Sequence, residues 1–297
     1  MFSGKGENEK KFICSIFAGL LSSQDNHLIQ VILEQLGQLT EEEKKDLKNI
    51  LERTTLSNVV RTIKEVDHRL EVLKTLKELI ADYTKQTLEN NIQRILDENF
   101  WIFGEQFRLF STTEGSLKNT LLKYAKEILE IENPSLSTEP KGEVDLFLTK
   151  TEESNDIQKN IIVELKRPYI KLSEEKEYLQ LKKYCNKITK EPLCNGANQY
   201  WEFYLIGTNY DKTIEDLIKS QGAEKQKGLV YAPEERIKIY VRKWSDILEV
   251  EWGNKMKFLK EKLEIQSKSE KYLSPNDLTN SVIDRKIEAG TSKPQKK

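Results

Sequence analysis

Cysteine is scarce in this chain, which has three in 297 residues, and no two of them stand at a spacing typical of a zinc site. We therefore expect Cys14, Cys185 and Cys194 to be structural thiols in a reducing compartment, with a disulfide between Cys185 and Cys194 as the open alternative. The two histidines, His27 and His68, lie far apart and lack cysteine partners. Surface or packing roles are therefore favoured over metal binding.

Long apolar runs are also missing. No segment approaches the roughly 20 apolar residues of a membrane span. The apolar stretch from Phe12 to Leu21 is short and lacks a small-residue cleavage site, so no signal peptide is predicted. The chain also contains no phosphate loop, dinucleotide fingerprint or nucleophile elbow. We expect a soluble, cytoplasmic protein with no nucleotide cofactor evident in this chain and no serine-hydrolase site.

Neither sign of charge is in clear excess, because 48 basic and 49 acidic residues leave a net charge of −1. Overall charge therefore does not attract nucleic acid, and any attraction must come from a local patch. One candidate patch consists of Lys166, Arg167, Lys171, Lys176, Lys182, Lys183, Lys187 and Lys190. The alternative is that the neighbouring acids Glu174, Glu175 and Glu177 cancel it.

What is present is a hairpin pattern, in which a polar stretch joins two apolar segments at 143–149 and 160–166. Closure about Ser154 and Asn155 gives one apolar face, with three facing pairs: Val144 with Leu165, Leu146 with Val163, and Leu148 with Ile161. The same register places Asp145 directly across from Glu164. Lys166 projects from the same side as both carboxylates, so three charged groups are predicted to converge.

Two carboxylates on neighbouring strands repel each other unless a cation lies between them. A set of oxygen ligands without histidine or cysteine suits Mg²⁺ or Mn²⁺. Both ions also bind phosphate oxygens. Lys166 could orient or deprotonate an attacking water, or stabilise the charge that develops on a phosphate. The pattern therefore predicts phosphodiester hydrolysis at Asp145, Glu164 and Lys166.

Asp145 followed by Glu164-Leu165-Lys166 resembles the PD-(D/E)xK nuclease superfamily, although Val144 stands where many members have proline. The next segment, 173–190, is predicted to be a helix with Ser173 as its N-cap. Its apolar stripe consists of Tyr178, Leu181, Cys185 and Ile188. On another side lie Gln180 and Tyr184, which resemble the Gln-x-x-x-Tyr motif of one branch of the superfamily.

A narrower resemblance begins upstream. Residues 88–104, which include Asn-Phe-Trp-Ile-Phe-Gly, are similar to the first nuclease helix and following turn of the Shedu antiphage defence nucleases. Together with Glu-Leu-Lys-Arg-Pro at 164–168, this resemblance covers roughly residues 84–263. It implies a Mg²⁺-dependent DNA endonuclease in antiviral defence that assembles as a homo-oligomer. The residues expected to act are Asp145, Glu164, Lys166 and Gln180 in catalysis, Tyr184, Arg167, Lys183 and Lys187 on the substrate, and Asp145, Glu164 and the helix carboxylate Glu89 at the metal.

Three regions are predicted along the chain. Residues 1–83 are helical, with a capping box from Thr40 to Glu43, and would serve oligomerisation or regulation. Residues 84–266 alternate helices and strands, which favours an α/β fold with a mixed sheet, the PD-(D/E)xK core that the resemblance implies. Residues 267–297 are polar and lack periodicity, so we expect a flexible tail.

Two other functions compete with the nuclease. Fold alone does not guarantee activity, so the domain could be a catalytically silent module that binds nucleic acid or a protein partner. The chain could also be a helical scaffold whose α/β part is merely structural. An Asp at a strand start and a Glu-x-Lys pair are each ordinary on a solvated sheet. Their combination with the hairpin and the Gln180 helix favours the nuclease.

Overall fold

A computed structural model of the chain describes residues 26–83, 85–112, 116–152, 156–221, 227–263 and 274–290. The chain divides into two compact units, Met1–Ile63 and Lys64–Lys297. Their boundary falls inside helix α4 (Leu56–Ala81), whereas the sequence pattern placed it after residue 83. An uninterrupted helix offers no break in periodicity, so the earlier boundary leaves no signal in the sequence.

The N-terminal unit is helical in its described part, with α2 (Asn26–Gln38), α3 (Glu41–Leu51) and the start of α4. The predicted capping box is present, because the amide of Glu43 donates to Thr40 Oγ1 and the amide of Thr40 donates to the Glu43 carboxylate. Helix α3 buries no residue. Large apolar side chains are exposed instead, at Val31, Ile32, Leu36, Ile50, Leu51, Leu56, Val60 and Ile63. The predicted segment from Phe12 to Leu21 and Cys14 lie outside the described residues.

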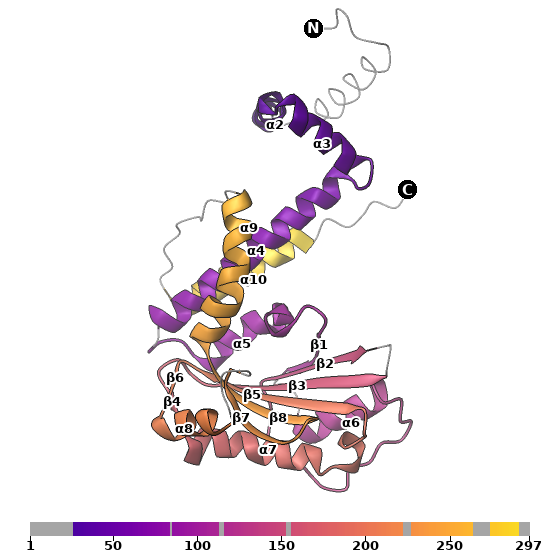
Figure 1. Cartoon of the computed structure of the whole chain (residues 1–297), viewed down its shortest axis with the longest axis vertical. Coiled ribbons are helices and arrows are strands. Elements are labelled where there is room, and N and C mark those ends of the chain that lie inside the picture. Colours follow the sequence, from indigo (N-terminus) through magenta and orange to yellow (C-terminus); the bar gives the residue numbers. More distant parts are fainter. Residues whose placement is uncertain are drawn as a thin grey trace, which may run out of the picture. The chain divides into compact units, whose positions relative to one another are not determined.

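The second unit is built on a mixed six-stranded sheet, so the predicted mixed α/β class is confirmed (Figure 1). β3, β5 and β8 run parallel at the centre, while the outer strands pair antiparallel. In spatial order the strands are β1 (Arg108–Thr112), β2 (Leu146–Glu152), β3 (Ile157–Leu165), β5 (Gln199–Gly207), β8 (Ile237–Lys243) and β7 (Leu229–Glu234). A separate two-stranded ladder joins β4 (Lys171–Leu172) to β6 (Asn209–Tyr210).

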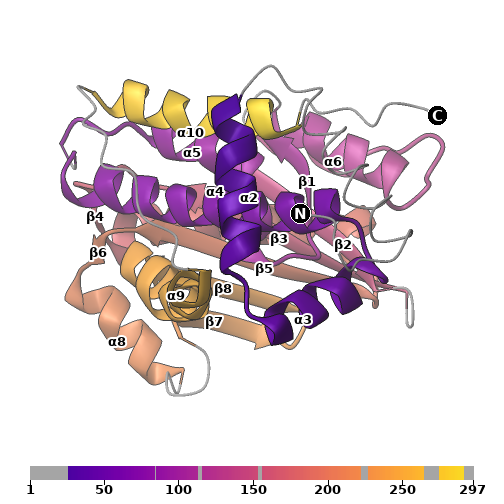
Figure 2. The ribbon, with the colours of Figure 1, turned by 90° about the horizontal axis from the view of Figure 1, so that it is seen from above.

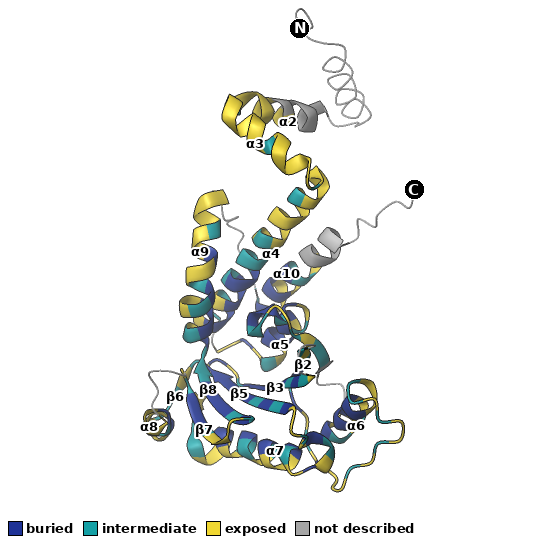
Figure 3. Cartoon of the chain, turned by 45° about the vertical axis from the view of Figure 1, so that its right-hand side comes forward, coloured by how far each residue is buried: buried dark blue, intermediate teal, exposed yellow. Residues whose placement is uncertain are grey.

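Helices cover both faces of the sheet. One face packs on α6 (Leu117–Glu127), α7 (Leu179–Thr189) and α8 (Lys212–Ser220). The other packs on the end of α4, α5 (Glu89–Glu98), α9 (Trp252–Leu263) and α10 (Pro275–Gly290), as Figure 2 shows. The central strands between these layers are mostly buried (Figure 3). None of the helices in the described ranges combines the length and apolar composition needed to cross a bilayer.

The alternation of β3 divides its side chains between the two cores. Ile161, Val163 and Leu165 belong to the core under α5, while Ile162 belongs to the core over α7. Two buried free thiols, Cys185 and Cys194, lie in the α7 core, and burial raises the pKa of each to about 12. Their packing agrees with the predicted structural role.

The predicted hairpin register is confirmed, with Leu146 across from Val163 and Leu148 across from Ile161. Strand pairing extends to Glu152 and Ile157, so the connection is shorter than predicted. At the other end the prediction was wrong for Val144. The ladder begins at Leu146, and Val144 packs in the core over α7 rather than beside Leu165.

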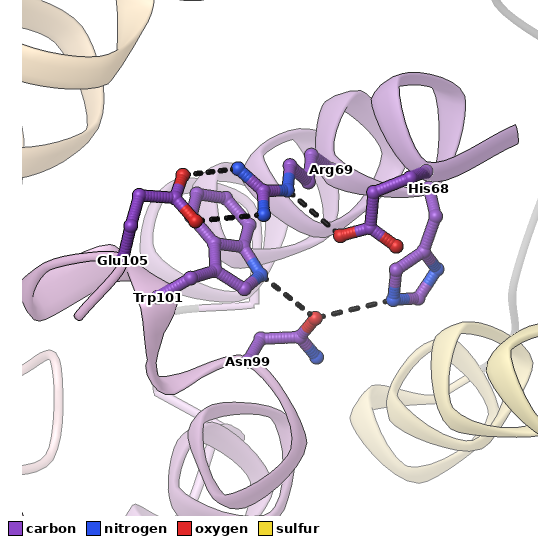
Figure 4. Close-up of polar contacts among 6 residues, drawn as sticks. His68, Arg69, Asn99, Trp101 and Glu105 are labelled. Carbon is purple, nitrogen blue, oxygen red and sulfur yellow. Dashed lines mark hydrogen bonds and ion pairs between the residues drawn. The ribbon is translucent and has the colours of Figure 1, made fainter. Parts of the chain in front are cut away.

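Helix α4 is tied to α5 and to the following turn η1 (Phe100–Phe103) by a polar network (Figure 4). Asn99 Oδ1 accepts from Trp101 Nε1 and from His68 Nε2, each at 3.1 Å. The Arg69 guanidinium lies 4.8 Å from the centre of the Trp101 ring and also pairs with Glu105. His68 therefore has a packing role, as its sequence context predicted.

The predicted flexible tail contains helix α10, so the tail prediction does not hold over 275–290. Leu278 and Val282 are 2% and 1% exposed and join the core under α5. Asn91 and Arg94 of α5 also donate hydrogen bonds to α10, at Asn276 and Asn280. The helix could not be predicted from the sequence, because only a narrow apolar stripe is buried and the apolar periodicity is therefore weak.

Replacement of Leu278 by alanine is expected to lower the free energy of unfolding by about 2–4 kcal/mol, because the change removes buried methyl groups and leaves a cavity. Chemical denaturation measures the loss. Asp284→Ala, on the exposed side of the same helix, serves as the control and should change stability little. Equal stability of Leu278→Ala and wild type would show that α10 does not pack as described.

Candidate functional site

The predicted charged residues gather where the β2–β3 hairpin ends. Asp145 lies directly before β2, Glu164 is near the end of β3, and Lys166 follows that strand. The amide of Leu165 donates to Asp145 Oδ2 at 2.6 Å, which holds the aspartate against the end of β3. The structure therefore brings all three predicted residues together, although Asp145 stands just outside the regular ladder.

Glu164 is the centre of the polar contacts. Its Oε1 accepts from Lys166 Nζ at 2.7 Å and from Gln180 Nε2 at 2.9 Å. The Gln180 amide also lies 3.4 Å from the Tyr184 hydroxyl and donates to it. Gln180 and Tyr184 both project from α7, so the helix predicted to follow the catalytic strand reaches the carboxylate cluster.

That helix differs from the prediction in its first turn. Residues 174–178 form a π-helical turn, η2 (Glu174–Tyr178), before α7 begins at Leu179. Ser173 occupies the N-cap position, as predicted, but its side chain accepts no hydrogen bond from the helix. Instead its amide and hydroxyl donate to the Glu177 carboxylate at 2.9 and 2.8 Å. The predicted apolar stripe is nevertheless buried, at Tyr178 of η2 and at Leu181, Cys185 and Ile188 of α7.

Helix α5 supplies two residues from the opposite side of the site. Glu89 Oε1 accepts from the backbone amide of Arg167 at 3.3 Å. One turn later Gln93, 6% exposed, donates to the backbone carbonyl of Asp145 at 3.1 Å. Sequence reasoning missed Gln93, although its spacing of four residues from Glu89 places both on one face of the helix.

An open groove of about 700 Å³ exposes this cluster. Its lining comprises Glu89, Ser116, Lys118, Glu139, Pro140, Lys141, Gly142, Glu143, Asp145, Glu164, Lys166, Gln180 and Tyr184. The predicted substrate residues Arg167, Lys183 and Lys187 are exposed but do not line it. Lys187 lies at its margin, since its Nζ donates to the Lys141 carbonyl at 3.0 Å.

Burial makes both side chains weaker acids than usual, because it disfavours the charged carboxylate. Burial, and then the charge of Glu164, raise the pKa of Asp145 to about 7, against the opposing hydrogen bond from Leu165. Burial also raises the pKa of Glu164, and Lys166 opposes the shift. Burial lowers the pKa of Lys166, but the charges of Glu164, Glu89 and Asp145 together outweigh burial, and the net pKa is raised. Lys166 is therefore an ammonium at neutral pH.

The donor set fits a hard divalent cation. Within the described residues, neither Asp145 Oδ1 nor Glu164 Oε2 makes a hydrogen bond, so one oxygen of each carboxylate is free beside the groove. Nowhere in the described part of the chain do three His, Cys, Asp or Glu side chains form a metal-binding group, so Glu89 does not complete a triad. Two carboxylates with water or phosphate oxygens suffice for Mg²⁺.

Gly142 sets the distance between the loop before β2 and α7. Its φ of +125° disfavours other residues, and a Cβ there would lie 2.7 Å from Cε1 of Tyr184. Gly142→Ala is therefore expected to destabilise the protein by about 1–3 kcal/mol and to displace Tyr184. Thermal unfolding measures the effect. Gly37→Ala, where a Cβ meets nothing within 4 Å, is the control; equal melting temperatures for both variants and wild type would contradict this packing.

Comparison of the chain with protein-family models, with curated proteins and with solved structures finds no match in any of the three. The proposed function therefore rests on the geometry of the groove and on the sequence resemblance.

Proposed function

We propose that the chain is a metal-dependent endonuclease that hydrolyses phosphodiester bonds in DNA. The observation that carries this proposal is the convergence of Asp145, Glu164 and Lys166 in an open groove, with a free oxygen on each carboxylate. Repulsion between two buried carboxylates costs folding free energy, and a site that binds a cation recovers that cost on binding. A purely structural role would not need both acids.

Asp145 and Glu164 would hold Mg²⁺ or Mn²⁺ through these free oxygens. The bound cation would supply Lewis-acid polarisation of a phosphate oxygen and a lower pKa for a nearby water. Leu165 and Gln93 position Asp145 through its carboxylate and its backbone carbonyl, respectively. Gln180 positions Glu164 from the other side. The ligand pair is thus fixed by contacts from β3, α5 and α7.

Lys166 acts as a cation rather than as a base in this proposal. Its raised pKa keeps the ammonium protonated, so it can donate to a phosphate oxygen and stabilise the charge that develops there. The Tyr184 hydroxyl, which accepts from Gln180, retains its own proton for a substrate oxygen. Arg167, Lys183 and Lys187 lie exposed around the groove and would contact the DNA backbone.

The cellular role is proposed from the resemblance to the Shedu nucleases and the PD-(D/E)xK superfamily, which implies antiphage defence. That resemblance also implies a homo-oligomer. The eight exposed large apolar side chains of the N-terminal unit, from Val31 to Ile63, support this, because such residues are usually covered in an assembled protein. Size-exclusion chromatography with light scattering measures the oligomeric state.

The proposed activity is tested by incubating the protein with supercoiled and linear DNA in Mg²⁺, in Mn²⁺ and in chelator. Metal-dependent nicking or cutting is expected in the wild type and not in Glu164→Gln, which preserves size but removes the charge. Cleavage that persists in chelator, or equally in Glu164→Gln, would refute the site. DNA binding without cleavage under every condition would instead favour the catalytically silent module.

A further inference from the structure

A second cavity, of about 350 Å³, lies at the other end of the sheet, beside the amino ends of β3, β5 and β8. Its lining is rich in basic and aromatic side chains: Phe107, Lys150, Lys159, Asn160, Ile161, Tyr200, Trp201, Glu202, Glu235, Arg236 and Lys238. Cavities of about 300–1,000 Å³ are typical of small-molecule sites. This volume is at the low end of that range, so the cavity suits a compact ligand.

Four cationic side chains line the cavity: Lys150 of β2, Lys159 of β3, Lys238 of β8, and Arg236 of the turn before β8. Lys150 and Lys159 share the carboxylate of Glu152, at 3.3 and 2.6 Å. Arg236 pairs with Glu234 at 2.8 Å. Lys238 makes no ion pair or side-chain hydrogen bond within the described residues, although it is partly buried. One ammonium is therefore available to a ligand from inside the cavity.

The acidic side chains of the lining do not neutralise Lys238. Glu202 lies across from Lys238 in the strand register, but its carboxylate accepts a hydrogen bond from Tyr204 at 2.7 Å and forms no ion pair with that lysine. Glu235 is exposed to solvent. Glu152 and Glu234 already pair with three of the four cations, so within the described residues Lys238 is the cation of the lining left to attract an anionic ligand.

Two aromatic rings complete the lining. Tyr200 and Phe107 are each half-buried, and within the described residues neither ring pairs with another aromatic ring. Lys150 Nζ lies 5.1 Å from the centre of the Phe107 ring, which leaves Tyr200 as the ring without a cation or ring neighbour. A flat ligand ring could stack there, since every nucleobase has a π-face.

We propose that this cavity binds a nucleotide, with the phosphate held by Lys238 and Lys159 and the base against Tyr200. The ligand is a phosphorylated aromatic base, either a free mononucleotide or a nucleotide within a single strand. No phosphate loop or dinucleotide fingerprint marks it in the sequence, because its residues come from five separate segments. The site goes beyond the proposed nuclease and does not depend on it.

The cavity is separate from the catalytic groove. Lys159 and Glu164 lie on the same strand, β3, five residues apart, which corresponds to roughly 17 Å along a strand. An odd separation also places them on opposite faces of the sheet. Binding can therefore be measured in chelator, without cleavage, so failure of this proposal and failure of the nuclease are distinguishable.

Isothermal titration calorimetry of the full chain in chelator tests the site. The probes are AMP, GMP, CMP and UMP, with adenosine and inorganic phosphate as the separate halves of the ligand, and an oligothymidylate as the strand. At least one nucleotide probe is expected to bind about tenfold more tightly than either half, because stacking and charge-assisted hydrogen bonds both contribute. Tighter binding of the oligothymidylate than of the mononucleotides would identify a strand as the source.

Variants locate the binding. Lys238→Met and Tyr200→Ala are each expected to weaken it about tenfold, whereas Lys126→Glu on α6 should not change it. Circular dichroism checks that each variant is folded. The proposal is overturned if no nucleotide binds, if phosphate alone binds as tightly as a nucleotide, or if folded Lys238→Met and Tyr200→Ala bind like the wild type.

Discussion

Lys166→Ala is expected to reduce the rate of DNA cleavage roughly 10²–10³-fold, because it removes the ammonium that lies in the groove beside Glu164 Oε1. DNA binding should fall far less, since exposed cations such as Lys183 and Lys187 remain. The measurement is single-turnover cleavage of a labelled duplex, with affinity determined separately in chelator. Loss of rate without loss of affinity would place Lys166 in the chemical step.

The matched control is Lys171→Ala, which removes the same charge from an exposed position in β4. Its cleavage rate should stay within a few-fold of the wild type. Lys166→Ala also leaves Glu164 without its ion-pair partner, so its folding must be verified by circular dichroism. Comparable cleavage by folded Lys166→Ala and Lys171→Ala would contradict the role assigned to Lys166.

Asp145→Asn is expected to stabilise the metal-free protein, on the order of 2 kcal/mol at pH 8. The substitution removes a buried charge beside Glu164, while the amide oxygen can still accept the hydrogen bond from Leu165. Saturating Mg²⁺ should stabilise the wild type, by about 2.7 kcal/mol at one hundred times the dissociation constant, and should leave Asp145→Asn unchanged. Chemical denaturation with and without metal measures both effects.

The pH dependence gives the sign of the Asp145 effect. The pKa of Asp145 is about 7 in the folded state, above the ordinary value of 3.8. Between pH 3.8 and pH 7, Asp145 is therefore protonated in the folded protein and ionised in the unfolded chain. The contribution of Asp145 to the free energy of unfolding is therefore lost as pH rises from about 4 to 7. The difference between Asp145→Asn and wild type should be small below pH 4 and reach a plateau above pH 7. If the difference in the free energy of unfolding between Asp145→Asn and wild type did not change with pH, the ionisation of Asp145 would not be its cause.

The sequence predicted the hairpin and its register because symmetric closure about Ser154 and Asn155 places apolar residues of the two segments across from each other. A slip of one residue would no longer pair Leu146 with Val163 or place Asp145 across from Glu164. That register was enough to bring Asp145, Glu164 and Lys166 together. Spacing on one helix placed Gln180 and Tyr184 on the same side.

Other parts of the site depend on contacts that no local pattern encodes. In the sequence, Gln93 is indistinguishable from any other polar residue of a helix. Its hydrogen bond to the Asp145 carbonyl exists only because α5 packs over the hairpin. The sequence identifies Gly142 only as a loop residue. Its close approach to Tyr184 is visible only in the folded structure. Helix α10 is buried through a few side chains whose partners on α5 are far away in sequence.

The division of β3 between two cores makes its length more critical than most of its individual residues. One residue inserted between Ile161 and Glu164 would turn Glu164 toward the face covered by α5 and put Leu165 in the polar groove. Conservative apolar substitutions at Ile161 or Val163 would only repack a core. Homologous chains with the same site should therefore vary in composition along this strand but share its residue count.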